Sequence, residues 1–283
     1  MPFNSIPSGL TKRPAYPGRV IKRDEADPGV VKLIQQRLNE TGCGPVKVNG
    51  TFDRGQTEVA VKLFQGRFPD ATGRPLIVDG KVGSLTWGAL FGASTVPSSV
   101  EVPTGLIATV LAIANGEIGV MEKPLGSNRG PKVDEYLKSV GLNPAGGSFP
   151  WCVAFTYYCF HTAAQSLGVQ NPHVRTAGVL AHWNAAKGVP GAVRITHAAA
   201  TNNPALVRPG QLFIMDFGGG AGHTGLVLAV EDGRLTTIEG NTNDGGARNG
   251  VGVFKREARK IAGINKGFID YSAIQMTKIV RSR

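Results

Sequence analysis

The sequence predicts an α+β protein built from a small three-helix domain and a larger domain in which helices precede an antiparallel sheet. Three observations lead to this prediction. At 283 residues, the chain exceeds the usual length of a single domain. Apolar residues recur at helical spacing on both sides of a stretch rich in Ser, Thr, Val and Pro at 93–104. Short segments rich in β-forming residues follow only after residue 210.

The three-helix domain is expected over residues 26–92, after a proline-rich leader at 1–25. Asp27-Pro28 supplies a helix cap followed by the residue that is best tolerated at the first helical position. The residues that predict the three helices are Val31, Ile34, Gln35 and Leu38, then Thr57, Ala60, Val61 and Phe64, then Leu85, Trp87 and Leu90.

Two stretches of this domain echo each other. Asn49-Gly50-Thr51-Phe52 leads to Thr57, and Asp79-Gly80-Lys81-Val82-Gly83 leads to Thr86. In each copy an Asx-Gly turn is expected to precede a helix that begins near the threonine, which would act as its cap. Tight turns that feed helices explain all of these residues, so the echo alone indicates no function.

The second domain is expected over residues 105–283, beyond a linker at 93–104. Its predicted helices cover residues 106–118, 133–140 and 150–168. Its predicted strands cover residues 211–216, 225–230, 235–239 and 251–255. Helices followed by consecutive strands are typical of an α+β layer arrangement.

The chain is basic, with 31 Lys and Arg against 20 Asp and Glu and a formal net charge of +11. Such a surface attracts polyanions, or it simply serves solubility. The basic residues lie in scattered pairs such as Lys12-Arg13 and Arg259-Lys260, without the aromatic interleaving of a nucleic-acid module. We therefore expect no nucleic-acid partner.

The residues before position 25 contain several prolines and lack the apolar core of a secretory signal, and no run is long enough to span a membrane. We expect synthesis in the cytoplasm without a signal peptide, and no membrane insertion. Three cysteines, Cys43, Cys152 and Cys159, are an odd and low number, which argues against a disulfide framework.

Cys152 is the candidate nucleophile because Pro150-Trp151-Cys152 places it in the first turn of an apolar helix. The positive end of the helix dipole favours a thiolate there, and the free backbone N–H groups can hold an oxyanion. A small buried hydrophobic residue is the alternative interpretation of any free cysteine. We expect that interpretation to hold for Cys159 and Cys43.

His223 is the candidate base, since Gly222-His223-Thr224-Gly225 places it at the mouth of a strand after a glycine loop. The remaining histidines lack this setting and are expected on the surface or in packing; they are His161, His173, His182 and His197. The next strand ends in Glu239-Gly240-Asn241, and alternation sends both polar residues to one face, where either can approach the imidazole.

A cysteine nucleophile, a histidine base and a third polar group that orients it form a generalised catalytic triad. The sequence therefore predicts a catalytic set of Cys152, His223, Glu239 and Asn241. No histidine pair has the spacing of zinc ligands, so neither a metal nor another cofactor is expected.

The first domain resembles the peptidoglycan-binding domain 1 family, a three-helix module that targets the bacterial cell wall. The matching residues are Val31-x-x-Ile34-Gln35-x-x-Leu38, Gly50-Thr51-Phe52 with Thr57, Ala60-Val61-Lys62-x-Phe64-Gln65, and Asp79-Gly80-x-Val82-Gly83-x-x-Thr86-Trp87-x-x-Leu90. One departure is a longer stretch at 66–78. The resemblance implies that peptidoglycan is the binding partner.

The second domain resembles the CHAP family, the cysteine- and histidine-dependent amidohydrolases and peptidases of peptidoglycan. The matching residues are Pro150-Trp151-Cys152-x-x-Phe155, Gly222-His223-x-Gly225 and Glu239-Gly240-Asn241, with a looser match at Glu122, Ser127, Asn128, Gly130, Val133, Tyr136 and Leu137. Gln211 departs from the family, which commonly has an aspartate there.

The CHAP resemblance implies a papain-like fold in which Cys152 attacks an amide carbonyl and His223 protonates the leaving amine. Glu239 is the better candidate to hold His223, because a carboxylate also stabilises imidazolium. Asn241 either orients the ring or polarises the oxyanion.

Together the resemblances imply a monomeric peptidoglycan hydrolase of the endolysin type, released to the wall by a partner such as a holin. One alternative is an injected interbacterial toxin or tail-associated lysin that uses the same chemistry and a secretion apparatus. Another is a catalytically inactive wall-binding protein. The choice between an N-acetylmuramoyl-L-alanine amidase and an endopeptidase stays open.

Overall fold

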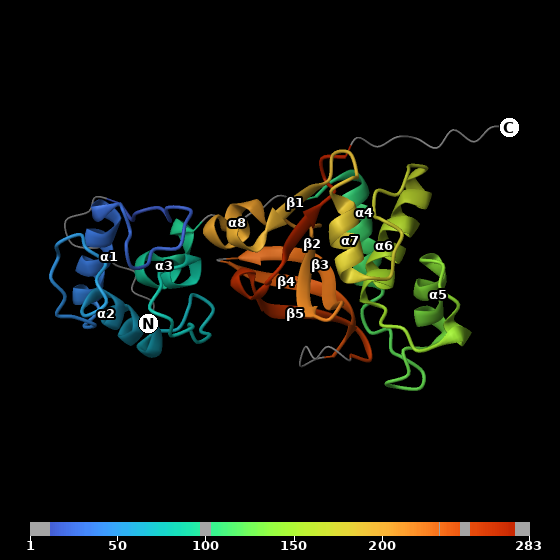
Figure 1. Cartoon of the computed structure of the whole chain (residues 1–283), viewed down its shortest axis with the longest axis horizontal. Helices are drawn as coiled ribbons and strands as arrows, with labels where there is room; N and C mark the ends of the chain where they lie inside the picture. Colours follow the sequence, from blue (N-terminus) through green and yellow to red (C-terminus); the bar gives the residue numbers. More distant parts are fainter. Residues whose placement is uncertain (1–11, 97–102, 232, 244–249, 275–283) are drawn as a thin grey trace. The chain divides into compact units, whose positions relative to one another are not determined.

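The computed structural model describes residues 12–96, 103–231, 233–243 and 250–274, which form two compact units (Figure 1). Parts of the predicted leader and linker, residues 1–11 and 97–102, lie outside the described residues. In the part of the chain that is described, no helix combines the length and the apolar character needed to cross a membrane.

Three helices build the first unit, as predicted. They are α1 (Pro28–Glu40), α2 (Thr57–Arg67) and α3 (Ser84–Phe91), and the short 3-10 helix η1 (Ala93–Thr95) follows them. The Asp27 carboxylate caps α1 by accepting the backbone N–H groups of Gly29 and Val30 at 2.9 and 3.2 Å. The predicted cap and the predicted start of this helix are thus confirmed.

The core of the first unit draws on all three helices and on residues before them. Ile34, Phe64 and Trp87 are buried together, one from each helix. Tyr16 packs edge-on against Trp87 with ring centroids 5.9 Å apart, and Ile21 pairs with Val82 in a β-bridge. Residues from the predicted leader therefore contribute to this core.

A buried glutamine explains the first copy of the sequence echo. The side-chain oxygen of Gln35 accepts the backbone N–H groups of Asn49 and Gly50, at 3.0 and 2.9 Å. Its amide nitrogen donates to the hydroxyl of Thr57 at 3.0 Å. The Asx-Gly turn is thus held by a side chain of α1.

The second copy repeats this arrangement from α2. Gln65 accepts the backbone N–H groups of Asp79 and Gly80 and donates to the Thr86 hydroxyl at 3.2 Å. Thr86 lies inside α3, which begins at Ser84, and it makes no capping bond there. The prediction that the threonines cap their helices was wrong, because each hydroxyl instead accepts a hydrogen bond from the side-chain amide of a buried glutamine.

The second unit combines helices with one sheet. Its helices are α4 (Gly105–Gly116), α5 (Pro131–Ser139), α6 (Cys152–Leu167), α7 (Val179–Ala186) and α8 (His197–Asn202), with 3-10 turns η2 (Pro144–Gly146), η3 (Pro204–Leu206) and η4 (Ile261–Gly263). Its strands are β1 (Val193–Thr196), β2 (Leu212–Gly218), β3 (Ala221–Glu231), β4 (Arg234–Thr242), β5 (Gly252–Lys260) and β6 (Gly267–Asp270).

The sheet is antiparallel throughout its described pairs, in the order β1-β6-β2-β3-β4-β5. α6 packs on β3 and β4, while α7 packs on β2 and β3, so helices cover the centre of the sheet (Figure 1). The predicted α+β class and all four predicted strands are confirmed. The sequence did not indicate α7, α8, β1 or β6, which are all short.

Candidate active site

The start of α6 carries the predicted nucleophile. The helix begins at Cys152, directly after Trp151, and ends at Leu167, where the positive φ of 65° at the following Gly168 provides the left-handed stop. Its first backbone N–H groups have no acceptor within the helix, which is the general property of a helix start. The predicted position of Cys152 in the first turn is confirmed.

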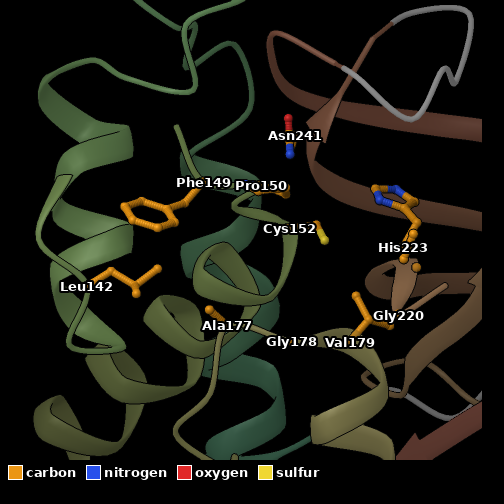
Figure 2. A pocket seen from close by; sticks show the side chains of 12 residues that line it. Leu142, Phe149, Pro150, Cys152, Ala177, Gly178, Val179, Gly220, His223 and Asn241 are labelled. Carbon is orange, nitrogen blue, oxygen red and sulfur yellow. The ribbon is translucent and has the colours of Figure 1, made fainter. Parts of the chain in front are cut away.

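Cys152 and His223 line one pocket of about 240 Å³ (Figure 2). Apolar side chains, glycine-rich backbone and one amide side chain complete the lining, which comprises Leu142, Phe149, Pro150, Ala177, Gly178, Val179, Gly220, Ala221, Gly222 and Asn241. The structure thus brings the candidate nucleophile and the candidate base to the same cavity from α6 and β3.

Two motif glycines permit the close packing behind this pocket. A Cβ at Gly240 of β4 would lie 2.7 Å from Phe155 and 2.8 Å from Trp151, so only glycine lets the start of α6 approach the strand. A Cβ at Gly225 of β3 would lie 2.8 Å from the Cγ of Glu239. Steric constraints therefore explain why glycine stands at positions 225 and 240.

Glu239 holds the imidazole of His223. Both side chains are buried, at 0% and 4% exposure, and the His223 Nε2 lies 2.8 Å from the Glu239 Oε2. Because Nε2 is occupied by this bond, Nδ1 is the ring nitrogen that remains to exchange a proton with Cys152. Glu239 rather than Asn241 is thus the side chain that contacts the imidazole.

Arg259 is part of this arrangement, and the sequence did not single it out. From β5 it donates through Nε to the Glu239 Oε1 and through Nη2 to Oε2 at 2.6 Å. The Thr237 hydroxyl also donates to Oε1. A buried carboxylate needs such partners. The only feature of the sequence that could have indicated Arg259 is therefore the presence of a glutamate, Glu239, in a predicted buried strand.

The charges of these residues are coupled. Burial lowers the pKa of His223, but its interactions with Cys152 and Glu239 outweigh burial and raise the pKa to about 9. Burial raises the pKa of Glu239, but hydrogen bonds from Arg259 and His223 outweigh it and lower the pKa to about 2. His223 is therefore an imidazolium and Glu239 a carboxylate at neutral pH.

Asn241 lines the pocket with Cys152 and His223, but its backbone departs from the regular alternation of a strand. Its φ of 55° takes it out of the extended conformation, and the register between β4 and β5 shifts between Glu239 and Thr242. With the side-chain amide in the orientation that gives both of its atoms a partner, its oxygen accepts the backbone N–H of Trp151 at 3.1 Å and its nitrogen donates to the Gly250 carbonyl at 2.9 Å. Asn241 thus supports the start of α6 from the pocket wall, and among the described residues it makes no hydrogen bond with His223.

The other cysteines and the other histidines lie outside the pocket. Cys43 and Cys159 are buried, and burial raises the pKa of the Cys159 thiol. His173 and His182 are buried and stacked, with centroids 4.0 Å apart. Within the described ranges, no group of three or more His, Cys, Asp or Glu side chains could hold a metal ion.

Comparison with known proteins agrees with this geometry. Residues 144–241 match the family described as the CHAP domain, a range that contains Cys152, His223, Glu239 and Asn241. Residues 28–90 match a peptidoglycan binding domain family, PG_binding_1, over all three helices of the first unit. No significant match was found among curated proteins or solved structures. The chain therefore combines an N-terminal peptidoglycan binding domain with a CHAP domain, the domain of cysteine-dependent amidohydrolases.

Proposed function

We propose that this chain hydrolyses amide bonds of bacterial peptidoglycan, with Cys152 as the nucleophile and His223 as the acid and base. The observation that carries the proposal is the pocket shared by Cys152 and His223, behind which Glu239 bonds the imidazole. The match to a CHAP domain supports the same chemistry, and the match to a peptidoglycan binding domain supports the substrate.

The proposed reaction is an acyl transfer in two steps. The Cys152 sulfur attacks the amide carbonyl carbon, and the backbone N–H groups at the start of α6 stabilise the resulting oxyanion. His223 gives its proton to the leaving amine as the C–N bond breaks, which leaves a thioester on Cys152. A water deprotonated by His223 then hydrolyses the thioester and restores the free thiol.

Digestion of purified peptidoglycan tests the proposal. We expect release of soluble fragments by the unaltered chain and none by Cys152→Ala, whereas Cys159→Ala, which removes a buried thiol outside the pocket, keeps most activity. Mass spectrometry of the fragments identifies the bond that is cut, and so separates amidase from endopeptidase. Lysis that survives in Cys152→Ala would exclude this mechanism.

We propose further that the first unit tethers the catalytic domain to the wall, because a tether raises the local concentration of the enzyme at its substrate. Full-length Cys152→Ala should sediment with insoluble peptidoglycan at physiological salt. The same variant without residues 1–96 should remain in the supernatant. Equal sedimentation of both would show that the first unit does not target the wall.

The bacteriolytic, endolysin-type role belongs to the same proposal. It is supported by the combination of a wall-binding domain with a hydrolase domain in one chain. Expression of the chain in bacteria should cause lysis when a pore-forming protein opens the inner membrane, and Cys152→Ala should not. Absence of lysis under those conditions, with wall digestion intact in vitro, would point to a different biological role.

A further inference from the structure

A second pocket of about 180 Å³ adjoins the catalytic pocket. Pro150 and Asn241 line both pockets, so a substrate that occupies one can extend into the other. The remaining walls of the second pocket are Glu122, Gly126, Asn128 and Gly250. These residues include one acid and no basic side chain.

Glu122 is the unusual member of this lining. It is 1% exposed, and its Oε1 accepts the indole N–H of Trp151 at 2.8 Å. Its Oε2 is also buried but has no hydrogen-bond partner among the described residues. A buried carboxylate normally has a cation or several donors around it, since desolvation of the charge is otherwise uncompensated.

Among the described residues, the surroundings of Glu122 supply further acceptors but no counter-ion. Asn128 uses its amide nitrogen to donate to the Ser148 hydroxyl at 2.9 Å, which leaves its carbonyl oxygen as an acceptor. Asn241 uses its amide nitrogen on the Gly250 carbonyl. Over the described residues, no Lys or Arg forms a salt bridge with Glu122. The pocket is therefore suited to a donor that carries positive charge.

We propose that this second pocket is a substrate subsite that binds a primary ammonium group of a peptidoglycan peptide, with Glu122 as its anionic partner. An ammonium group offers three donors, which match the carboxylate and the neighbouring amide oxygens. A metal ion fits less well because the pocket contains a single carboxylate. The proposal rests on the proposed peptidoglycan hydrolase function and adds a substrate preference to it.

Peptidoglycan supplies this chemistry, since its stem peptides contain a diamino residue whose side-chain amine stays free unless it is cross-linked. A stem anchored in the second pocket would extend past Pro150 and Asn241 toward Cys152. The enzyme should therefore prefer stems that are not cross-linked. This preference is a property of the subsite and not of the Cys152–His223 chemistry.

Chemical acetylation of wall amines tests the proposal. The unaltered chain should digest acetylated walls about tenfold more slowly than untreated walls at limiting wall concentration, which corresponds to the loss of one hydrogen bond between charged groups. Acetylation makes the wall more anionic, and a basic protein should bind such a wall more tightly. Slower digestion would consequently indicate a specific site for the amine.

Glu122→Gln links the preference to this pocket. Glutamine keeps an acceptor for the Trp151 indole but removes the charge, so this variant should digest both walls at one common, reduced rate. Glu135→Gln, which removes an exposed carboxylate outside the pocket, should keep the tenfold preference. Equal digestion of both walls by the unaltered chain, or a preference that persists in Glu122→Gln, would overturn the proposal.

A probe experiment on the unaltered chain covers the case in which Glu122→Gln does not fold. At equal ionic strength, n-butylammonium chloride should inhibit wall digestion competitively and more strongly than tetramethylammonium chloride, which has no N–H donor. Equal inhibition by both salts would overturn the subsite. Failure of the unaltered chain to digest either wall would instead overturn the proposed hydrolase function itself.

Discussion

Arg259 binds both carboxylate oxygens of Glu239, the residue that holds the imidazole of His223. The candidate active site is therefore a chain of four side chains, in which Cys152 and His223 come from α6 and β3 while Glu239 and Arg259 come from β4 and β5. In their ionised forms these four groups carry balanced charge, which lowers the cost of burying them together.

Replacement of Arg259 should weaken catalysis by releasing Glu239. We expect Arg259→Met to lower kcat/KM by up to about a hundredfold, because the carboxylate loses the two bonds that fix its orientation. The pKa of Glu239 should rise from about 2 once its largest charge partner is gone, so the acid limb of the pH–rate profile should move to higher pH. Arg259→Lys should retain part of the activity.

The same-strand residue Arg256 provides a control for this experiment. Its Nε is 3.8 Å from the Glu239 Oε1, farther than Arg259, and it also donates to the Asn243 carbonyl at 3.1 Å. Arg256→Lys should leave the acid limb in place. An unchanged pH–rate profile in Arg259→Met would show that Arg259 serves folding alone.

The pKa of His223 predicts the basic limb of activity. Because it is raised to about 9, the imidazolium that protonates the leaving amine is present below that pH and is lost as the pH rises through it. Glu239→Gln removes one of the bonds that raise this pKa, so the basic limb should move to lower pH. A basic limb that stays in place in this variant would contradict the role assigned to Glu239.

The rate at which iodoacetamide alkylates Cys152 measures the effect of His223 on the reactivity of Cys152 without any substrate. The positive charge of His223 beside Cys152 should promote attack of the Cys152 sulfur on an electrophile. We therefore expect His223→Ala to slow alkylation near neutral pH as well as wall digestion. Mass spectrometry of the modified peptide measures this rate, and equal rates with and without His223 would show that the two residues do not act as a unit.

Asn241 should act on the start of α6 and not on the imidazole. Asn241→Ala removes the acceptor for the Trp151 N–H and the donor to the Gly250 carbonyl, so activity should fall while the basic limb of the pH–rate profile stays near 9. Asn241→Asp keeps the acceptor for Trp151 and should recover part of the activity. A shifted basic limb in Asn241→Ala would instead favour contact with His223.

Two buried histidines should make the second unit sensitive to acid. Burial lowers the pKa of His173 to about 4 and that of His182 well below its usual range. The unfolded chain takes up these protons below about pH 6.5, so the free energy of unfolding should fall by up to about 1.4 kcal/mol per pH unit per histidine between 6.5 and 4. Urea unfolding at several pH values measures this slope.

A matched variant assigns the acid sensitivity to these residues. His173→Gln removes one titrating group while keeping a polar side chain beside the Thr156 hydroxyl, so it should flatten the slope. A free energy of unfolding that is constant from pH 6.5 to 4 would contradict the prediction.

The sequence by itself determined the elements that carry the site. Apolar periodicity and a proline-flanked start predicted α6 with Cys152 in its first turn. Strand-forming runs between glycines placed His223 and Glu239 on neighbouring strands, and these two residues lie in contact. Such signals act over a few residues, so they are visible in the sequence directly.

Only the tertiary structure decided which distant residues meet. Arg259 was one of several basic residues in the sequence, and the pairing of β4 with β5 brings it to Glu239. The four-residue strand β6 takes its place between β1 and β2 from hydrogen bonds with both neighbours, since so short a segment has little preference of its own.

Asn241 shows, within a single strand, the same difference between what the local sequence predicts and what the tertiary structure decides. Alternation predicted that Asn241 and Glu239 share a face, but alternation holds only while every residue is extended, and the φ of Asn241 is 55°. Its amide bonds the Gly250 carbonyl and also the Trp151 N–H, a partner that is distant in sequence. The backbone of Asn241 leaves the extended conformation because the folded chain provides these hydrogen-bond partners, and the alternation of residues within the strand does not indicate them.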